Sequence, residues 1–207
     1  MKRHVIPDMD LRARLAERGL ECHLLMSQPQ SREFPSLLVT ELGDLLQAAY
    51  GKTITPEHLT YETWAVTLSP SSSSTPSSKP VACSTLSFYS DMPSYFITRF
   101  EAVHPDSQKK GLGRLLYECI AVWTRFLVYG DALVLEGVAQ SDGDYCLVSV
   151  IDVDDQPDWE DIRDNEQGHG AFLRKLGFIR AQHDFHQTED EIAFQRAYHV
   201  PLEREDD

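Results

Sequence analysis

A short segment in the middle of the chain combines the residue types that bind phosphate. Residues 100–116 read FEAVHPDSQKKGLGRLL, in which Gly111 and Gly113 follow Lys109 and Lys110. The first N–H groups of a helix have no partner within it, and the helix dipole favours negative charge there. Glycine lets the backbone approach a phosphate closely. The segment therefore predicts an anion site where a strand passes into a helix.

The pattern on either side supplies that strand and that helix. Residues 95–103 are predicted to form a strand that ends before Pro105, and residues 111–129 have the apolar spacing of an amphipathic helix. Residues 132–138 (ALVLEGV) form the near-continuous apolar run that is typical of a buried central strand. The anion site would thus lie beside the middle of a sheet.

The remaining pattern predicts an α/β fold. Asp10 is the expected cap of the first helix, and Gly19 its end. Further helices are predicted over residues 11–18, 35–49 and 170–176, and further strands over 21–26, 63–68, 81–89, 178–185 and 192–200. A strand followed by a helix and another strand implies a parallel crossover, whereas hairpins imply antiparallel pairs. We therefore expect a mixed, mostly antiparallel sheet with helices on both faces.

Length, charge and cysteine spacing exclude several classes of protein. The 207 residues fit one domain, and the net charge of −14 leaves no basic stripe for nucleic acid. An acidic surface attracts cationic partners, although solubility alone also explains it. No run of about 18 apolar residues suggests a membrane span. The four cysteines are far apart, which predicts reduced thiols, no metal site and a cytoplasmic location, with the nucleus left open.

Two segments have a biased composition. Residues 69–79 (SPSSSSTPSSK) are rich in Ser and Pro and are expected to form the mobile tip of a hairpin. Residues 140–166 are rich in Asp and Glu and are expected to form an acidic insertion after the central strand. This insertion could recruit a polycationic amine, or it could be a solvated acidic loop.

Two motifs together resemble the GNAT superfamily of acyl-CoA-dependent N-acetyltransferases. The first is Gln108-x-x-Gly111-x-Gly113 after a strand that ends Ala102-Val103-His104-Pro105, and the second is Leu176-Gly177-Phe178 at the end of a later helix. Both stand in the family's order, and the resemblance covers roughly residues 21–200. It implies a single domain over residues 1–207 with a splayed central strand pair, and acetyl-CoA as co-substrate.

The resemblance also implies which residues hold acetyl-CoA. Backbone N–H groups of residues 108–113 would bind the pyrophosphate, and the Val103 N–H would pair with the pantetheine arm. The Glu101 N–H would point at the thioester carbonyl, as an oxyanion donor does. The residues expected to bind the co-substrate are Ala102, Val103, Gln108, Lys109, Lys110, Gly111, Leu112, Gly113 and Arg114.

The implied reaction is direct attack of a primary amine on the acetyl carbonyl, without a covalent enzyme intermediate. The amine must first lose a proton, so a general base is needed. Family positions for the base hold Ile97 and Arg99 here. Glu101, expected on the same pleat face as those two residues, is one candidate base, and Glu136 on the central strand is the other.

The group that protonates the departing thiolate is also absent from its family position. Leu173 stands where the family often has a tyrosine, so Tyr117, Tyr145 or water would have to replace it. These departures leave a second hypothesis open, a regulatory protein that binds acyl-CoA without turnover. The expected acceptor is a small amine, a polyamine-like molecule or a protein amine, and no metal is expected.

Overall fold

The computed structural model describes residues 2–26, 34–51, 53, 55–56, 63–71, 79–89, 92–129, 145–152, 168–181 and 191–198. The chain divides into two compact units, and strand β5 (Met92–Val103) contributes to both. The first unit contains Met1–Phe88 and Thr98–Val134, and the second contains Tyr89–Ile97 and Leu135–Asp207. The expectation that residues 1–207 form a single domain stays a prediction.

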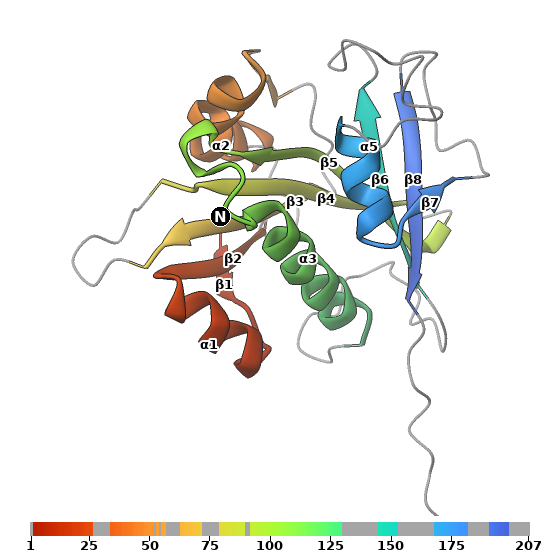
Figure 1. Ribbon diagram of the computed structural model, residues 1–207, viewed down its shortest axis with the longest axis horizontal. Helices are drawn as coiled ribbons and strands as arrows, with labels where there is room; N and C mark the ends of the chain where they lie inside the picture. The colour runs from red at the N-terminus through yellow and green to blue at the C-terminus, as the bar shows by residue number, and fades with distance from the viewer. Residues whose placement is uncertain are drawn as a thin grey trace, which may run out of the picture. The chain divides into compact units, whose positions relative to one another are not determined.

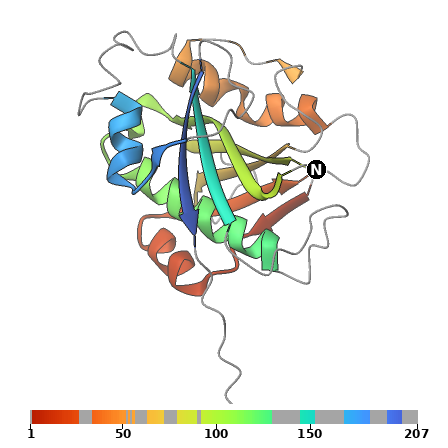
Figure 2. The same ribbon diagram turned by 90° about the vertical axis from the view of Figure 1, so that its right-hand side faces the viewer.

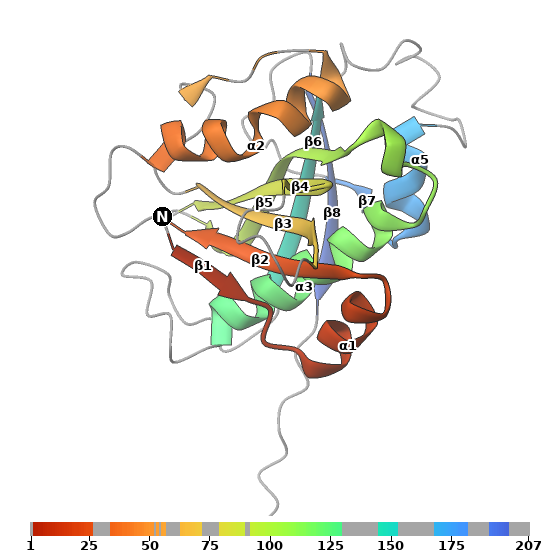
Figure 3. The same cartoon turned by 90° about the vertical axis from the view of Figure 1, so that its left-hand side faces the viewer.

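The first unit is a sheet covered by helices on both faces. Strands β1 (Lys2–Val5), β2 (Leu20–Met26), β3 (Thr63–Pro70) and β4 (Ala82–Tyr89) form successive antiparallel pairs, and β5 follows β4. Helix α2 (Phe34–Tyr50) covers one face, whereas α1 (Met9–Glu17) and α3 (Leu112–Tyr129) cover the other (Figures 1 and 3). β3 and β4 confirm the predicted hairpin, whose tip at residues 72–78 lies outside the described residues.

Apolar spacing in the sequence explains how α2 packs. Its buried leucines recur at helical intervals and meet short side chains of the sheet. The resulting core contains Leu38, Leu42, Leu45 and Leu46 of α2 with Leu25, Ala65, Cys83 and Ala102 of the strands. Ala102, at the end of β5, is thereby fixed in the core of the first unit.

The N-terminal residues differ from the prediction in two respects. Asp8, not Asp10, caps α1, since its Oδ1 accepts a hydrogen bond of 2.7 Å from the Leu11 N–H. Lys2–Val5 forms β1, which the polar composition concealed. Polar and charged residues are common on edge strands, and β1 gains its hydrogen bonds by pairing with β2.

The second unit contains the first half of β5, β6 (Tyr145–Asp152), β7 (Ile179–Arg180), β8 (Glu191–Tyr198) and helix α5 (Gly168–Lys175). Its strands follow the order β5-β6-β8-β7, and β8 pairs antiparallel with both β6 and β7 (Figure 2). Ile97, Val148, Val150 and Ala193 form its core.

The strand beside β5, on the side away from β4, is β6, in a segment where we expected no strand. The expected central strand over residues 132–138 lies outside the described part of the chain. β6 falls inside the segment that we read as an acidic insertion over residues 140–166. Leu147, Val148 and Ser149 are fully buried, so the apolar run of a buried strand was present but was obscured by the acids on both sides.

The fold class is confirmed. Eight described strands form a mixed, mostly antiparallel sheet, and four described α-helices accompany them. The predicted strand over residues 178–185 is described only at its start, as β7, and the splay of the central strand pair stays a prediction. No helix among the described residues is long and apolar enough to span a membrane.

Candidate functional site

The second half of β5 carries a bulge directly before the predicted anion loop. Phe100 has φ of 53°, a left-handed conformation that residues other than glycine seldom adopt. Two side chains of β4 bond the neighbouring carbonyls, Thr85 to Arg99 at 2.7 Å and Cys83 to Phe100 at 3.9 Å. Phe100 itself packs against the core below α2. The bulge changes which way the next side chain, Glu101, points.

Glu101 lies in a cluster of hydroxyl groups. Its Oε1 accepts a hydrogen bond from Thr98 Oγ1 and another, of 3.0 Å, from Tyr117 Oη on α3. The Tyr50 hydroxyl of α2 donates to the Glu101 carbonyl. Thr98 is fully buried and Tyr117 is 4% exposed, whereas Glu101 is only partly buried. The carboxylate is therefore oriented by two buried donors.

This contact corrects the predicted face of Glu101. A regular strand would place Glu101 with Ile97 and Arg99, on the face opposite to Thr98. The bulge at Phe100 breaks the alternation, so the Glu101 carboxylate instead meets Thr98 and the α3 side of the sheet.

The backbone of β5 after the bulge offers donors in the predicted direction. The Ala102 N–H donates to the Cys83 sulfur, and the His104 N–H donates to Val81 O at 2.9 Å. Both groups therefore point toward β4. Because N–H groups alternate along a strand, those of Glu101 and Val103 point away from β4. This direction favours the Glu101 N–H as the expected oxyanion donor and the Val103 N–H as the expected partner of the pantetheine arm. It does not favour a direct role for the Ala102 N–H.

The loop before α3 exposes a run of backbone donors. The 3₁₀ turn Pro105–Ser107 is followed by Lys109 with φ of 59° and Gly111 with φ of 78°. The first bond of the helix runs from the Leu115 N–H to Gly111 O at 3.2 Å. Within the described chain, no acceptor is bonded to the N–H groups of residues 109–114. Six consecutive donors can thus turn toward one anion.

The cationic side chains at the loop differ in their exposure and in their hydrogen-bond partners. Lys109 and Lys110 are exposed, and the Lys110 ammonium donates to Asp106 O at 2.7 Å. Arg114 is 74% exposed and bonds Glu118 at 3.3 Å, one turn further along α3. The Gln108 side chain donates to Val103 O at 3.3 Å, and so connects the loop to the strand. Leu112 is buried, and Gly113 is in the first turn of α3.

Two further predicted or family-derived positions are Glu136 and Leu173. Glu136 lies outside the described residues, so its role stays a prediction. Leu173, on α5, is fully buried, and its carbonyl accepts a bond of 3.0 Å from the Phe178 N–H at the end of that helix. It is a core and capping residue of the second unit. Tyr117 is the only one of the suggested replacement acids that the described residues bring to Glu101.

Three further residues reach this region without having been predicted. Thr98 and Tyr50 bond Glu101, and Arg18, from the end of α1, bonds the carbonyl of Lys110 at 3.4 Å. Thr98 could have been suspected, since it stands between Ile97 and Arg99. Tyr50 and Arg18 are 51 and 92 residues away from their partners, and no local pattern connects them.

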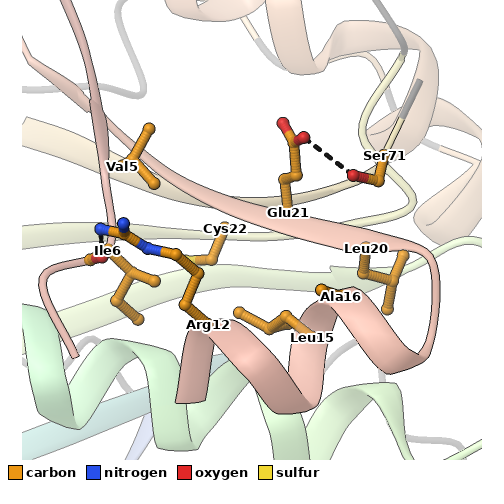
Figure 4. Close-up of a pocket in the computed structure, with 9 residues that line it drawn as sticks. All are labelled: Val5, Ile6, Arg12, Leu15, Ala16, Leu20, Glu21, Cys22 and Ser71. Atoms are coloured by element: carbon orange, nitrogen blue, oxygen red, sulfur yellow. Dashed lines mark hydrogen bonds between the residues drawn. The ribbon is translucent and has the colours of Figure 1, made fainter. Parts of the chain in front are cut away.

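A pocket of about 280 Å³ lies elsewhere in the first unit, between β1, α1 and β2 (Figure 4). Its floor is apolar, and its charged groups are engaged, since Arg12 donates to Ile6 O at 2.6 Å and Glu21 accepts from Ser71 at 2.8 Å. It contains none of the predicted site residues.

The thiols are poor candidates for nucleophiles. Burial raises the pKa of Cys83 to about 12 and that of Cys146 to about 11. A hydrogen bond with Cys22, together with burial, raises the pKa of Cys119. Since a thiol must ionise to attack, these three stay unreactive at neutral pH. Among the described side chains, no group of three or more His, Cys, Asp or Glu could hold a metal ion.

The fold, with its strand, bulge, donor loop and helix, is that of the GNAT acyl-CoA N-acyltransferases. No family model and no curated protein matches the sequence. An acyl-CoA N-acyltransferase from Pseudomonas aeruginosa is similar in structure at 12% identity and a TM-score of 0.50, over 86% of this chain and 99% of that one. A candidate N-acetyltransferase from Lactobacillus plantarum gives 12% identity and a TM-score of 0.50, over 88% and 99%. At such identities the likeness establishes the fold and leaves the activity to the site.

Proposed function

We propose that this protein transfers the acetyl group of acetyl-CoA to a primary amine. The observation that carries the proposal is the run of N–H groups at residues 109–114, which have no acceptor among the described residues. They precede and begin the 18-residue helix α3, after the 3₁₀ turn that follows β5. Phosphate oxygens would satisfy these donors, and the pyrophosphate of CoA, which the resemblance implies, would supply such oxygens.

The residues of the loop fit that co-substrate. Val103, Gln108, Lys109, Lys110, Gly111, Leu112 and Gly113 would provide the cradle, and Arg114 would add charge at its edge. A left-handed φ at Gly111 lets the chain turn its donors toward the anion without a Cβ in the way. Acetyl-CoA supplies the activated acetyl group, and the protein supplies position and proton transfer.

Glu101 is the proposed general base. Thr98 and Tyr117 orient its carboxylate. Its backbone N–H, which points away from β4 by the alternation along the strand, would be the donor to a developing oxyanion. In the reaction the amine nitrogen forms a bond to the acetyl carbon and loses a proton to Glu101, directly or through water. The carbon–sulfur bond breaks, and the CoA sulfur takes up a proton. Glu136 remains the alternative base.

Direct transfer is favoured over a covalent enzyme intermediate. The thiols of Cys83, Cys119 and Cys146 have raised pKa values and are held within the core or are partly buried. The acceptor is proposed to be a cationic amine, either a small molecule or a peptide. The net charge of −14 supports this choice, because it attracts cations.

A screen of amine acceptors with acetyl-CoA, read out as thiol release, tests the activity. The panel contains a polyamine, an aminoglycoside, free lysine and a basic peptide. Acetylated product with one of them supports the proposal. CoA binding without product from any acceptor favours instead the non-catalytic acyl-CoA-binding protein, and absence of CoA binding contradicts both.

A matched pair of loop variants connects that activity to the loop. Gly111→Ala places a Cβ on a residue at φ of 78° and is expected to raise the KM for acetyl-CoA about tenfold. Gly51→Ala has a similar φ of 68°, with no atom within 4 Å of the added Cβ, but it follows α2. It is expected to lower stability without changing that KM. Equal KM effects of the two variants would argue against the loop.

A further inference from the structure

The N-terminal helix sends an arginine to the phosphate loop. Arg18 is the C-cap residue of α1, and its Nη1 donates to Lys110 O at 3.4 Å. The same nitrogen lies 3.7 Å from the position that a Cβ on Gly111 would take. An arginine 92 residues away in sequence therefore lies against the residues that expose the N–H run.

A second contact fixes α1 beside α3. Arg14, one turn before Arg18, bonds Glu118 of α3 at 2.6 Å, and Glu118 also accepts from Arg114 at 3.3 Å. Leu11 and Leu15, on the inner side of α1, are 4% and 1% exposed. The end of α1 is thus held by packing and by an ion pair, so Arg18 starts from a defined position.

The charges around the loop are unequally balanced. Glu118 pairs with both Arg14 and Arg114. By contrast, no carboxylate of the described residues is within 4 Å of Arg18, Lys109 or Lys110. Arg18 uses one N–H on a neutral carbonyl, and a guanidinium has five donors in a planar fork. In a chain of net charge −14, these three cations gather where the backbone also offers donors.

We propose that Arg18 is a phosphate-binding residue of the acyl-CoA site, contributed by α1. This inference rests on the proposed function. An arginine fork binds phosphate oxygens bidentately and adds geometric selectivity that a lysine lacks. CoA carries a pyrophosphate and a 3′-phosphate, and either could be the group that Arg18 contacts.

Titration calorimetry with CoA, dephospho-CoA and pantetheine tests the inference on four variants. Arg18→Gln is expected to raise the Kd for CoA about tenfold, and Arg18→Glu to raise it further, because a carboxylate repels phosphate. Arg125→Gln and Arg125→Glu make the same charge changes at an exposed arginine of α3, about three turns further along the helix than Arg114, and are expected to change the Kd about twofold or less. Pantetheine binding is expected to be equal in all variants.

The ligands identify the phosphate. If Arg18→Gln weakens CoA and dephospho-CoA alike, Arg18 binds the pyrophosphate; if it weakens only CoA, Arg18 binds the 3′-phosphate. Equal losses for Arg18→Gln and Arg18→Glu would mean that Arg18 only positions the loop, and would overturn the inference. Unchanged CoA binding in Arg18→Gln would also overturn it. If the wild-type protein does not bind CoA at all, the proposed function fails first, and the role of Arg18 fails with it.

Discussion

Two hydroxyl groups determine the direction of the Glu101 carboxylate. Thr98 and Tyr117 both donate to Oε1, and both are buried. A hydrogen bond to a charged group contributes about 1.5–3 kcal/mol. Part of that free energy holds the Glu101 carboxylate in one orientation on the bulged strand β5. The orientation of Glu101 therefore depends on two neighbouring hydroxyl groups.

Removing these donors is expected to lower kcat. Glu101→Gln removes the proposed base and should lower kcat by about 10²- to 10⁴-fold. Thr98→Val and Tyr117→Phe each remove one donor and should lower kcat about tenfold, with little change in the KM for acetyl-CoA.

Steady-state kinetics across pH provide the check, and Thr98→Ser is the matched control because it keeps the hydroxyl. Thr98→Ser should recover most of the rate that Thr98→Val loses. A full rate and an unchanged pH profile in Glu101→Gln would contradict the assignment and would direct attention to Glu136.

Protonation of the buried His23 is expected to lower the stability of the folded protein in mild acid. Burial is the largest effect and lowers its pKa from 6.5, and Arg3 lowers the pKa further. Glu21, whose carboxylate is 3.6 Å away, and Glu41 raise the pKa, but not enough to cancel the effect of burial. Between the folded pKa and 6.5 the unfolded chain binds more protons. Stability is thus present above about pH 6.5 and is lost as the pH falls below it.

Urea denaturation at pH 7.5, 6.5 and 5.5 measures this effect. His23→Gln should have a smaller fall in unfolding free energy over that interval than the wild-type protein. The fall that persists in the variant reports the other titrating groups. Identical slopes for the two proteins would contradict the prediction.

At the scale of elements, a glycine that ends a helix can be compared with a glycine inside a helix. Gly177 ends α5 with φ of 85°, its N–H donates to Arg174 O at 2.9 Å, and an added Cβ would lie 3.6 Å from Arg196. Gly43 lies inside α2, with no atom within 4 Å of an added Cβ. The same substitution should therefore have opposite effects.

Gly177→Ala is expected to lower the free energy of unfolding by about 1 kcal/mol, because alanine disfavours a left-handed conformation. Gly43→Ala is expected to raise it by about 1 kcal/mol, since alanine favours a helix interior. Chemical denaturation of the two variants checks both signs. A gain in stability from Gly177→Ala would contradict the role of Gly177 as the C-terminal cap.

The sequence predicted elements better than it predicted their contacts. α2, α3 and the β3–β4 hairpin followed from apolar spacing, and the strand–loop–helix around Gly111 followed from its glycines and lysines. β6 was missed because acidic flanks dominated its segment. The orientation of Glu101 depends on a left-handed Phe100, a residue type that gives no signal for a bulge.

At the scale of the molecule, the proposed acyl donor and the protein are both anionic. The net charge of −14 would repel CoA at long range, whereas Arg18, Lys109 and Lys110 would attract it at the proposed loop site. Salt screens exposed charges beyond a Debye length of about 10 Å at 0.1 M. The two effects therefore respond to salt in opposite directions, and the sign of the response shows which one dominates.

Contact attraction is expected to dominate in the wild-type protein, so that its Kd for CoA rises several-fold between 50 and 500 mM salt. The combined variant Arg18→Gln, Lys109→Gln, Lys110→Gln retains the repulsion and loses the local cations. Its Kd at 50 mM salt should be higher than that of the wild type, and should stay constant or fall as salt increases. Pantetheine, which carries no phosphate, controls for effects of salt on the apolar part of the ligand. A parallel rise in Kd with salt for both proteins would show that cations other than these three attract the donor.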